Sequence, residues 1–384
     1  MIGRQWSSTA QGRRSRRRPA RGAISRWELR LRARRRRPRP RRTCRCEAHK
    51  EPTGVTKAIE RAVAAGLVVR ELHPKKSESE TLSAWCAVFT AGQAVDSGTS
   101  PNPAALTRDL RARESDASVR RWCAWLGSEL VGAAQARKEG DGSYCRLYVS
   151  PAHQRRGAGR ALLAALLDGL AEWQVTILRG SVVAGSSGEQ FAARLGAQVV
   201  VRLTVLEQRI DATLLRRLER LPAPSGPALT VAHWSHSVPE HLIDSFTLAR
   251  GSILDAPDAE LQVHPDHWDV RRVREWEDEV RRRGNELRAT AALESTTGAV
   301  VGLTEVEVSS CSAASQHDTV VLPNHRGRGV GAWLKAAMTL RLQRDRPDII
   351  YVTSTVNVRN VRMLAVNRRL GYREIRRRSL IRQT

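Results

Sequence analysis

Hydrophobic and polar residues follow the same order twice along this chain. Between residues 66 and 212, short apolar runs predict strands, and longer amphipathic runs predict helices. The expected strands are residues 67–72, 122–126, 130–134, 145–149, 174–178 and 198–206. The expected helices are residues 79–95, 104–113, 160–173 and 189–195. Strands and helices mixed in this way place the first half of the chain in the α/β (α+β) class.

The order returns after a segment rich in proline and glycine, which we take as a linker over residues 213–228. Further strands are expected at residues 229–234, 287–293, 299–308, 318–322 and 349–353. Further helices are expected at residues 239–250, 267–283, 332–344 and 360–369. A length of 384 residues suits two domains. The repetition therefore predicts one domain over residues 66–212 and a second over residues 229–384.

One phrase occurs in both halves, 172 positions apart. The first copy runs from Val149 to Gly159 and the second from Val321 to Gly331, with Val, Pro, His, Arg and two Gly residues in common. Each copy follows an expected strand and opens an expected helix. Glycines let a backbone approach a ligand closely, and the free amides and dipole of a helix N-terminus attract anions. We therefore expect a phosphate group to bind at each turn.

The net charge of +26 is concentrated at the N-terminus, where residues 1–50 alone carry 19 Lys and Arg and two acids. Such a composition cannot form a core, so residues 1–60 are expected to be a disordered, Arg-rich tail. Three explanations remain open: a nucleic-acid-binding arm, an organelle transit sequence, or translated sequence upstream of the true start. The third is favoured, with Val55 as a possible initiator, because no aromatic residues or recognition motif support nucleic-acid binding.

The six cysteines include no Cys-x-x-Cys pair, and most lie in apolar surroundings. This pattern is typical of free thiols in a reducing cytoplasm, and it predicts neither a metal site nor a cysteine nucleophile. No apolar run approaches the roughly 18 residues that a membrane span needs. We therefore expect a cytoplasmic protein without membrane contact.

The Gln/Arg-x-x-Gly-x-Gly turn between a strand and a helix resembles the GNAT superfamily of N-acetyltransferases. Both copies fit the turn, at residues 154–159 and 326–331, and each is followed by a second helix closed by Leu-Gly, at residues 195–196 and 370–371. Over residues 66–384 the chain is more closely similar to tandem-GNAT proteins of actinobacteria, an architecture shared with mycothiol synthase. The resemblance implies two GNAT folds, each a mixed, mostly antiparallel sheet with flanking helices.

The resemblance also implies that acetyl-CoA is the co-substrate, without a metal. Turn amides would hold its pyrophosphate, the preceding strand would pair with its pantetheine arm, and Asn360 would touch that arm. The expected ligands in the first half are Val149, Gln154, Arg155, Arg156, Gly157, Ala158 and Gly159. Those in the second half are Val320, Val321, Leu322, Arg326, Gly327, Arg328, Gly329, Val330, Gly331 and Asn360.

A charged amine needs a base before it attacks a thioester. Glu305 and Glu307 are two apart on an expected strand, so both lie on one face. Glu305 is preferred because its Thr-Glu-Val phrase matches the family, and Asp318 is the rival base. The family position for a thiol-protonating tyrosine holds Asn367 in the second half and Ala192 in the first. The proton donor therefore stays open, with water or Tyr351 as alternatives.

These features together predict an enzyme that acetylates a primary amine of a small molecule, mainly in the C-terminal domain. The first half has no asparagine that corresponds to Asn360 and no paired strand glutamates. Asp255 and Asp258 are candidate acceptor ligands, because they lie where GNAT domains build acceptor specificity. Two alternatives are a non-catalytic module that binds CoA or a partner protein, and a protein- or ribosome-associated acetyltransferase. In the second alternative the basic tail binds RNA, which is less favoured.

Overall fold

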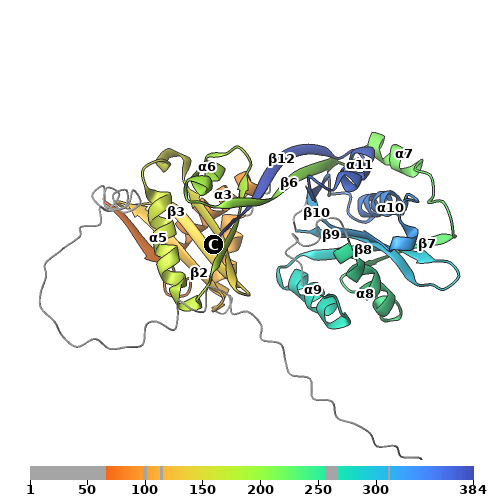
Figure 1. The fold of residues 1–384 in the computed structure, drawn as a ribbon, viewed down its shortest axis with the longest axis horizontal. Helices are drawn as coiled ribbons and strands as arrows, with labels where there is room; N and C mark the ends of the chain where they lie inside the picture. Colours follow the sequence, from red (N-terminus) through yellow and green to blue (C-terminus); the bar gives the residue numbers. More distant parts are fainter. Residues whose placement is uncertain (1–65, 98–101, 113–115, 256–266, 310–311) are drawn as a thin grey trace, which may run out of the picture. The chain divides into compact units, whose positions relative to one another are not determined.

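The computed structural model describes residues 66–97, 102–112, 116–255, 267–309 and 312–384 (Figure 1). The expected tail over residues 1–60 and the candidate Asp258 lie outside these ranges. The described chain has the expected α+β class, with helices around a mixed sheet of 12 strands.

The strands follow in chain order. They are β1 (Leu67–Glu71), β2 (Val119–Leu126), β3 (Glu129–Glu139), β4 (Gly142–Val149), β5 (Ile177–Val183), β6 (Gln198–Arg209), β7 (Leu229–Ser235), β8 (Glu286–Glu294), β9 (Val300–Val308), β10 (Ala313–Val321), β11 (Tyr351–Asn357) and β12 (Arg373–Gln383). The α-helices of the described residues are α3 (Ser79–Ser97), α4 (Pro103–Ala112), α5 (Ala158–Leu170), α6 (Ser187–Arg194), α7 (Ala212–Glu219), α8 (Ile243–Gly251), α9 (Val270–Arg282), α10 (Val330–Asp345) and α11 (Val361–Arg369).

The sheet order is the same when the two halves of the chain are interchanged. It runs β1-β2-β3-β4-β5-β12-β6-β11-β10-β9-β8-β7, so each strand of the first half has a counterpart six strands later. The last strand of each half pairs with the fifth strand of the other half: β12 with β5, and β6 with β11. The strands β6 and β12 also pair with each other. The two halves have therefore exchanged their final strands.

Helices cover both faces of the second-half strands. Strand β9 is buried along its whole length, and it contacts both α8 and α10. Figure 1 shows α8 and α9 on one side of β8 and β9, and α10 on the other. Leu303 on β9 packs with Phe246 of α8, whereas Val306 packs with Met338 of α10. The even-numbered and odd-numbered residues of β9 therefore face different helices, as strand alternation requires.

Several elements differ from the sequence expectation, among them β10, which begins at Ala313 and not at residue 318. The strand expected at residues 174–178 begins only at Ile177, because Gln174 has a φ of 52° and closes a short helical turn. The expected linker contains α7, which Asp211 caps by accepting a hydrogen bond from the Leu214 amide. Leu214 and Leu218, four residues apart, form its buried face. A helix of two turns offers too short a period to stand out beside the prolines that follow.

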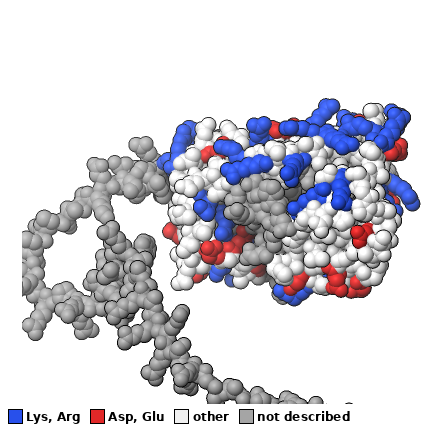
Figure 2. Space-filling view, turned by 45° about the vertical axis from the view of Figure 1, so that its right-hand side comes forward, with Lys and Arg blue, Asp and Glu red and all other residues white. Residues whose placement is uncertain are grey.

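Basic side chains are unevenly distributed over the described surface. Figure 2 shows Lys and Arg gathered mainly along the upper part of the face in view, with most Asp and Glu lower down. Helices α7 and α11 contribute basic residues in their last turns, where the helix dipole favours positive charge. The positive charge of the protein therefore extends beyond residues 1–50.

Candidate functional site

The strand before each glycine-rich turn separates from its parallel neighbour. Strand β10 pairs with β11 only over residues 313–316, and β4 pairs with β5 only over residues 142–144. Both strands then continue for several residues toward the turn, paired only on their other side. The later part of each strand, including Val149 and Val320, therefore has backbone groups along an open edge. An extended ligand can add to such an edge by hydrogen bonding.

Strand β10 also contains a bulge where it leaves β11. Gln316 pairs with Val306 of β9, but Thr319 pairs with Thr304, so His317 and Asp318 together oppose the single residue Glu305. Bulges of this kind redirect side chains and are common next to active sites. Strand β4 pairs with β3 without a register shift. The two halves therefore differ where the strand before the turn leaves its parallel neighbour.

The first side chain of each turn motif supports the turn itself. Gln154 Nε2 donates to the carbonyl of Val149 at 3.2 Å, and Arg326 Nε donates to the carbonyl of Val321 at 2.8 Å. Both acceptors are the last residue of the preceding strand. Both side chains hold the turn against the strand, which leaves the backbone amides of the turn for a ligand. Their expected role as cofactor ligands stays a prediction.

The helices that follow the two turns begin without a side-chain cap. Their N-cap residues, Gly157 and Gly329, have φ values of 94° and 87°, in the left-handed region that favours glycine. Four other helices, α6, α7, α9 and α11, are capped by side chains. Those caps are Ser186, Asp211, Asp269 and Asn360. The first amides of α5 and α10 are therefore available to an anion, with the helix dipole behind them.

Asn360 lies at the start of α11 as expected. Its Oδ1 accepts a hydrogen bond from the Met363 amide at 3.0 Å, so this oxygen is already used as a helix cap. Asn367 is fully buried, and neither polar atom of its side chain has a partner among the described residues. Ala192 is also buried. Asn367 and Ala192 occupy the position of the tyrosine that protonates the thiolate in the family. Neither side chain can donate that proton.

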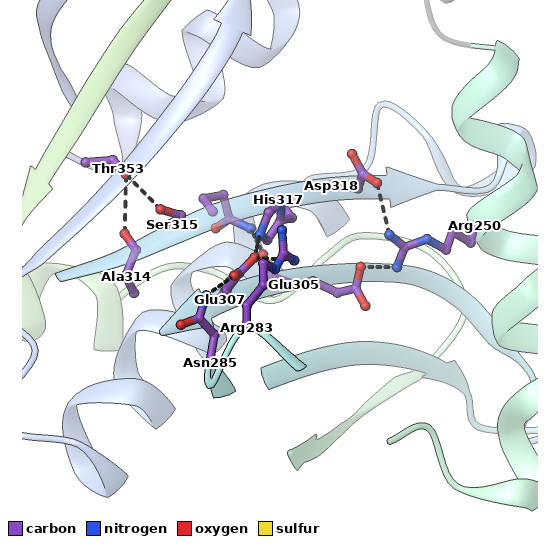
Figure 3. A network of polar contacts seen from close by, with 11 residues as sticks. Arg250, Arg283, Asn285, Glu305, Glu307, Ala314, Ser315, His317, Asp318 and Thr353 are labelled. Atoms are coloured by element: carbon purple, nitrogen blue, oxygen red, sulfur yellow. Dashed lines mark hydrogen bonds and ion pairs between the residues drawn. The ribbon is translucent and has the colours of Figure 1, made fainter. Parts of the chain in front are cut away.

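Glu305 belongs to a buried ion-pair group in which Arg250 is the shared partner (Figure 3). Its carboxylate binds Arg250 of α8, and a second nitrogen of that guanidinium lies 3.3 Å from Asp318 Oδ2. Arg250 stacks 4.0 Å from the centre of the Trp268 ring. Burial raises the pKa of Glu305, although Arg250 opposes that shift. Glu305 is only 1% exposed, so Arg250 already occupies the cation-binding side of this carboxylate.

Glu307 belongs to a second, more accessible group on the same face (Figure 3). It accepts hydrogen bonds from Asn285, from His317 Nε2 at 2.8 Å and from Arg283 at 3.2 Å. Burial acts to raise the pKa of Glu307, but the hydrogen bonds from His317 and Asn285 outweigh it and hold the pKa low. His317 is 29% exposed. Sequence reasoning missed His317 as a site residue, because nothing in the sequence reveals the bulge that turns it toward Glu307.

The remaining candidates fall elsewhere. The backbone of Asp255 ends a short helical turn after α8. In the first half, the strand before the turn carries no carboxylate, and Asp96 of α3 is the nearby acid. Asp96 lies 3.2 Å from Arg378 and 3.4 Å from the hydroxyl of Tyr148. Because Arg378 belongs to β12, the exchanged strand contributes a side chain to the first half.

Three further observations limit the chemistry of the described residues. Burial raises the pKa of Cys145 to about 11, so this thiol is protonated and a poor nucleophile at neutral pH. Within the described ranges, no group of three or more His, Cys, Asp and Glu side chains is placed to share a metal ion. No helix of this part of the chain is long and apolar enough to cross a membrane.

Comparisons with known proteins agree with this architecture. Residues 89–196 match the model of the acetyltransferase (GNAT) family. The whole fold is similar to a tandem GNAT protein from the clavulanic acid biosynthesis pathway, with 24% identity, a TM-score of 0.65, and 83% of this chain and 98% of that chain covered. A GCN5-related N-acetyltransferase from Sphaerobacter thermophilus gives 17% identity and a TM-score of 0.57 over 83% and 95% of the two chains. A search of curated proteins gave no match.

Proposed function

We propose that the chain transfers an acetyl group from acetyl-CoA to a primary amine of a small molecule, which the match of residues 89–196 to the GNAT acetyltransferase family model supports. The main catalytic site lies in the C-terminal half. One observation carries this assignment: the bulge in β10 coincides with the separation of β10 from β11, whereas β4 has no bulge.

The turn before α10 suits the pyrophosphate of CoA. Uncapped amides at Gly329, Val330 and Gly331 point from a helix N-terminus, and a phosphate there forms charge-assisted hydrogen bonds. The open edge of β10 suits the pantetheine arm, whose amides can add to the strand as a peptide would. This path ends at the bulge, beside the polar groups of β9 and β10. The acyl carbon would therefore lie next to Glu305, Glu307 and Asp318.

The side chains around the bulge suit proton removal from an amine. An amine that is charged in water must lose one proton before it attacks the thioester carbonyl, and a positioned base typically contributes ~10²–10⁴-fold. The carboxylates expected for this role, Glu305, Glu307 and Asp318, all belong to the network in Figure 3. Asp255 and Asp258, which follow α8 along the chain, remain the proposed acceptor ligands.

The proposal is tested by measuring release of the CoA thiol from acetyl-CoA with the full chain and a panel of primary amines. Gly329→Asp places a negative charge at the expected pyrophosphate position and should lower turnover at least about tenfold, because a charge-assisted bond is lost and repulsion is added. Gly157→Asp should reduce stability or the number of CoA molecules bound more than turnover.

Gly298→Asp is the matched control, because Gly298 also has a positive φ of 69° and open space around it, but lies in the hairpin between β8 and β9. It should cost stability through backbone strain alone and leave CoA binding intact. Equal loss of turnover from Gly157→Asp and Gly329→Asp would mean that both halves catalyse.

A second candidate is a module that binds CoA without turnover. It is favoured by the ion pairs of Arg250, which bind both Glu305 and Asp318 to one guanidinium. The same assay separates the two candidates. CoA binding that Gly329→Asp abolishes, without thiol release for any amine, would favour the binding module.

A further inference from the structure

We propose that His317, oriented by Glu307, is the group that takes the proton from the acceptor amine. This inference rests on the proposed acetyl transfer and names a residue that the sequence pattern does not single out. The preference from the sequence is Glu305, and the geometry of the network favours His317 instead.

The position of His317 in β10 suits this role. It is the first residue of the bulge and directly follows Gln316, the last residue of β10 that pairs with β11. A ligand that lies along the open edge of β10 therefore reaches His317 where that edge begins. Its imidazole points to the face of the sheet that carries Glu305 and Glu307, as Figure 3 shows.

The contact between His317 and Glu307 also suits a base. His317 Nε2 lies 2.8 Å from Glu307 Oε2, and this carboxylate has its other contacts to Asn285 and Arg283. A carboxylate without a proton only accepts hydrogen bonds, so Nε2 carries the hydrogen and Nδ1 keeps its lone pair. The edge-to-face contact with Trp276, at 5.1 Å between ring centres, further fixes the ring. Nδ1 has no hydrogen-bond partner among the described residues.

His317 is also more accessible to a substrate than Glu305 is. The side chain of His317 is 29% exposed, whereas that of Glu305 is 2% exposed and bound to Arg250. Removing a proton from a substrate requires direct approach or one bridging water. Within the part of the chain that the structure describes, His317 meets this requirement better than Glu305. We therefore assign Glu305 a positioning role, in which it holds Arg250 beside Asp318.

The charges around His317 suit a proton acceptor. Glu307 and Glu305 face it from β9, Asp318 follows it on β10, and Arg283 approaches Glu307 from the end of α9. When the imidazole gains a proton, Glu307 lies in contact with the new positive charge and stabilises it. This arrangement follows the logic of other base-and-carboxylate pairs, in which the acid orients the base and balances its charge.

Nδ1 of His317 takes one proton from the ammonium group, and the nitrogen lone pair then forms a bond to the acetyl carbon. The carbon–sulfur bond breaks, and the second proton of the nitrogen passes to the departing thiolate. The products are the N-acetyl amine and the CoA thiol, and His317 later releases its proton to water.

Two amines of similar size but different basicity provide the test. Ethylamine is almost fully protonated at neutral pH, whereas 2,2,2-trifluoroethylamine is largely neutral and does not need a base. His317→Gln should lower thiol release with ethylamine by ~10²-fold or more, and should change the rate with trifluoroethylamine by less than about tenfold. Glu307→Gln should reproduce this selective loss more weakly, because the imidazole remains but loses its orientation.

His241→Gln is the control, since His241 is an exposed histidine of the same half, far along the chain from the bulge. It should leave both rates unchanged. CoA binding by His317→Gln, measured by calorimetry, shows whether this variant is folded. If it is not, Glu307→Gln, which keeps the imidazole, serves instead: it should still lose ethylamine selectively, and normal use of both amines by this variant would contradict the inference.

The possible outcomes are distinct. If His317→Gln uses both amines normally while Glu305→Gln loses ethylamine selectively, the base is Glu305 and this inference is wrong. If His317→Gln loses both amines equally, the residue has a structural role only. If the wild-type protein releases no thiol with either amine or with any other amine of the panel, the proposed acetyl transfer itself fails.

Discussion

At the scale of single residues, the least expected feature is a buried lysine. Lys335 of α10 is 2% exposed, and its Nζ lies 4.8 Å from the centre of the Tyr372 ring. Thr339, one turn later on the same helix face, donates to the side chain of Gln208 on the exchanged strand β6 at 3.0 Å. Burial lowers the pKa of Lys335 from 10.5 to about 7.

This shift predicts how stability depends on pH. Between pH 7 and about 10.4, the unfolded chain keeps the lysine proton and the folded chain does not, so the free energy of unfolding should rise with pH in that range. Lys335→Met should remove this rise and make the protein more stable at pH 7. Urea unfolding at several pH values measures both effects. Lys75→Met, at an exposed position, is the control, and a slope that persists in Lys335→Met would contradict the assignment.

At the scale of elements, the two glycine-rich turns are held to the preceding strand in the same way by different side chains. Gln154 and Arg326 both hold the turn to the last carbonyl of the preceding strand. The shared contact, rather than the positive charge, is therefore what the first motif position supplies. Arg326 adds one contact, to the carbonyl of Ser252 at 3.2 Å.

Substitutions at Arg326 test this view. Arg326→Gln should keep the contact to Val321 and lose little affinity for CoA, whereas Arg326→Ala should loosen the turn and cost roughly 1 kcal/mol of binding or stability, as expected for one hydrogen bond. Calorimetry with CoA and thermal unfolding measure the two effects. Equal loss of affinity in both variants would mean that the charge of Arg326 acts on the phosphate directly.

The elements around the site differ in how well the sequence predicts them. The turns and helices α5 and α10 follow from glycine positions and apolar periodicity, because both are local properties of the chain. The bulge at His317 and Asp318 is not local, since it depends on the register between β10 and β9. The contacts of Glu305 with Arg250 and of Glu307 with Arg283 join residues far apart in sequence. The sequence therefore predicts the turns well, but it does not predict the partners of the carboxylates.

At the scale of the whole molecule, the exchange of β6 and β12 links the two halves. The alternation of residues in a strand reports which face is buried but not which neighbour it pairs with, so the sequence cannot reveal the exchange. In the described structure, β12 lies between β5 and β6 and places Arg378 beside Asp96. Neither half has a complete sheet without a strand from the other.

We expect that residues 1–220 and 221–384, expressed separately, do not fold, because each fragment leaves a strand unpaired and exposes apolar surface. Mixing or co-expressing the two fragments should restore a cooperative unfolding transition and CoA binding. Circular dichroism of each fragment and of the mixture measures this directly. A fragment that unfolds cooperatively on its own would show that the exchange is dispensable.

The exchanged strands also have a consequence for how the protein behaves on dilution. An assembly that swaps strands between separate subunits dissociates when its concentration falls below the dissociation constant. Here residues 220–228, between α7 and β7, join the two partners covalently. A linker this short sets an effective concentration in the millimolar range. The association of the halves is therefore a property of a single molecule, independent of how much protein the cell makes.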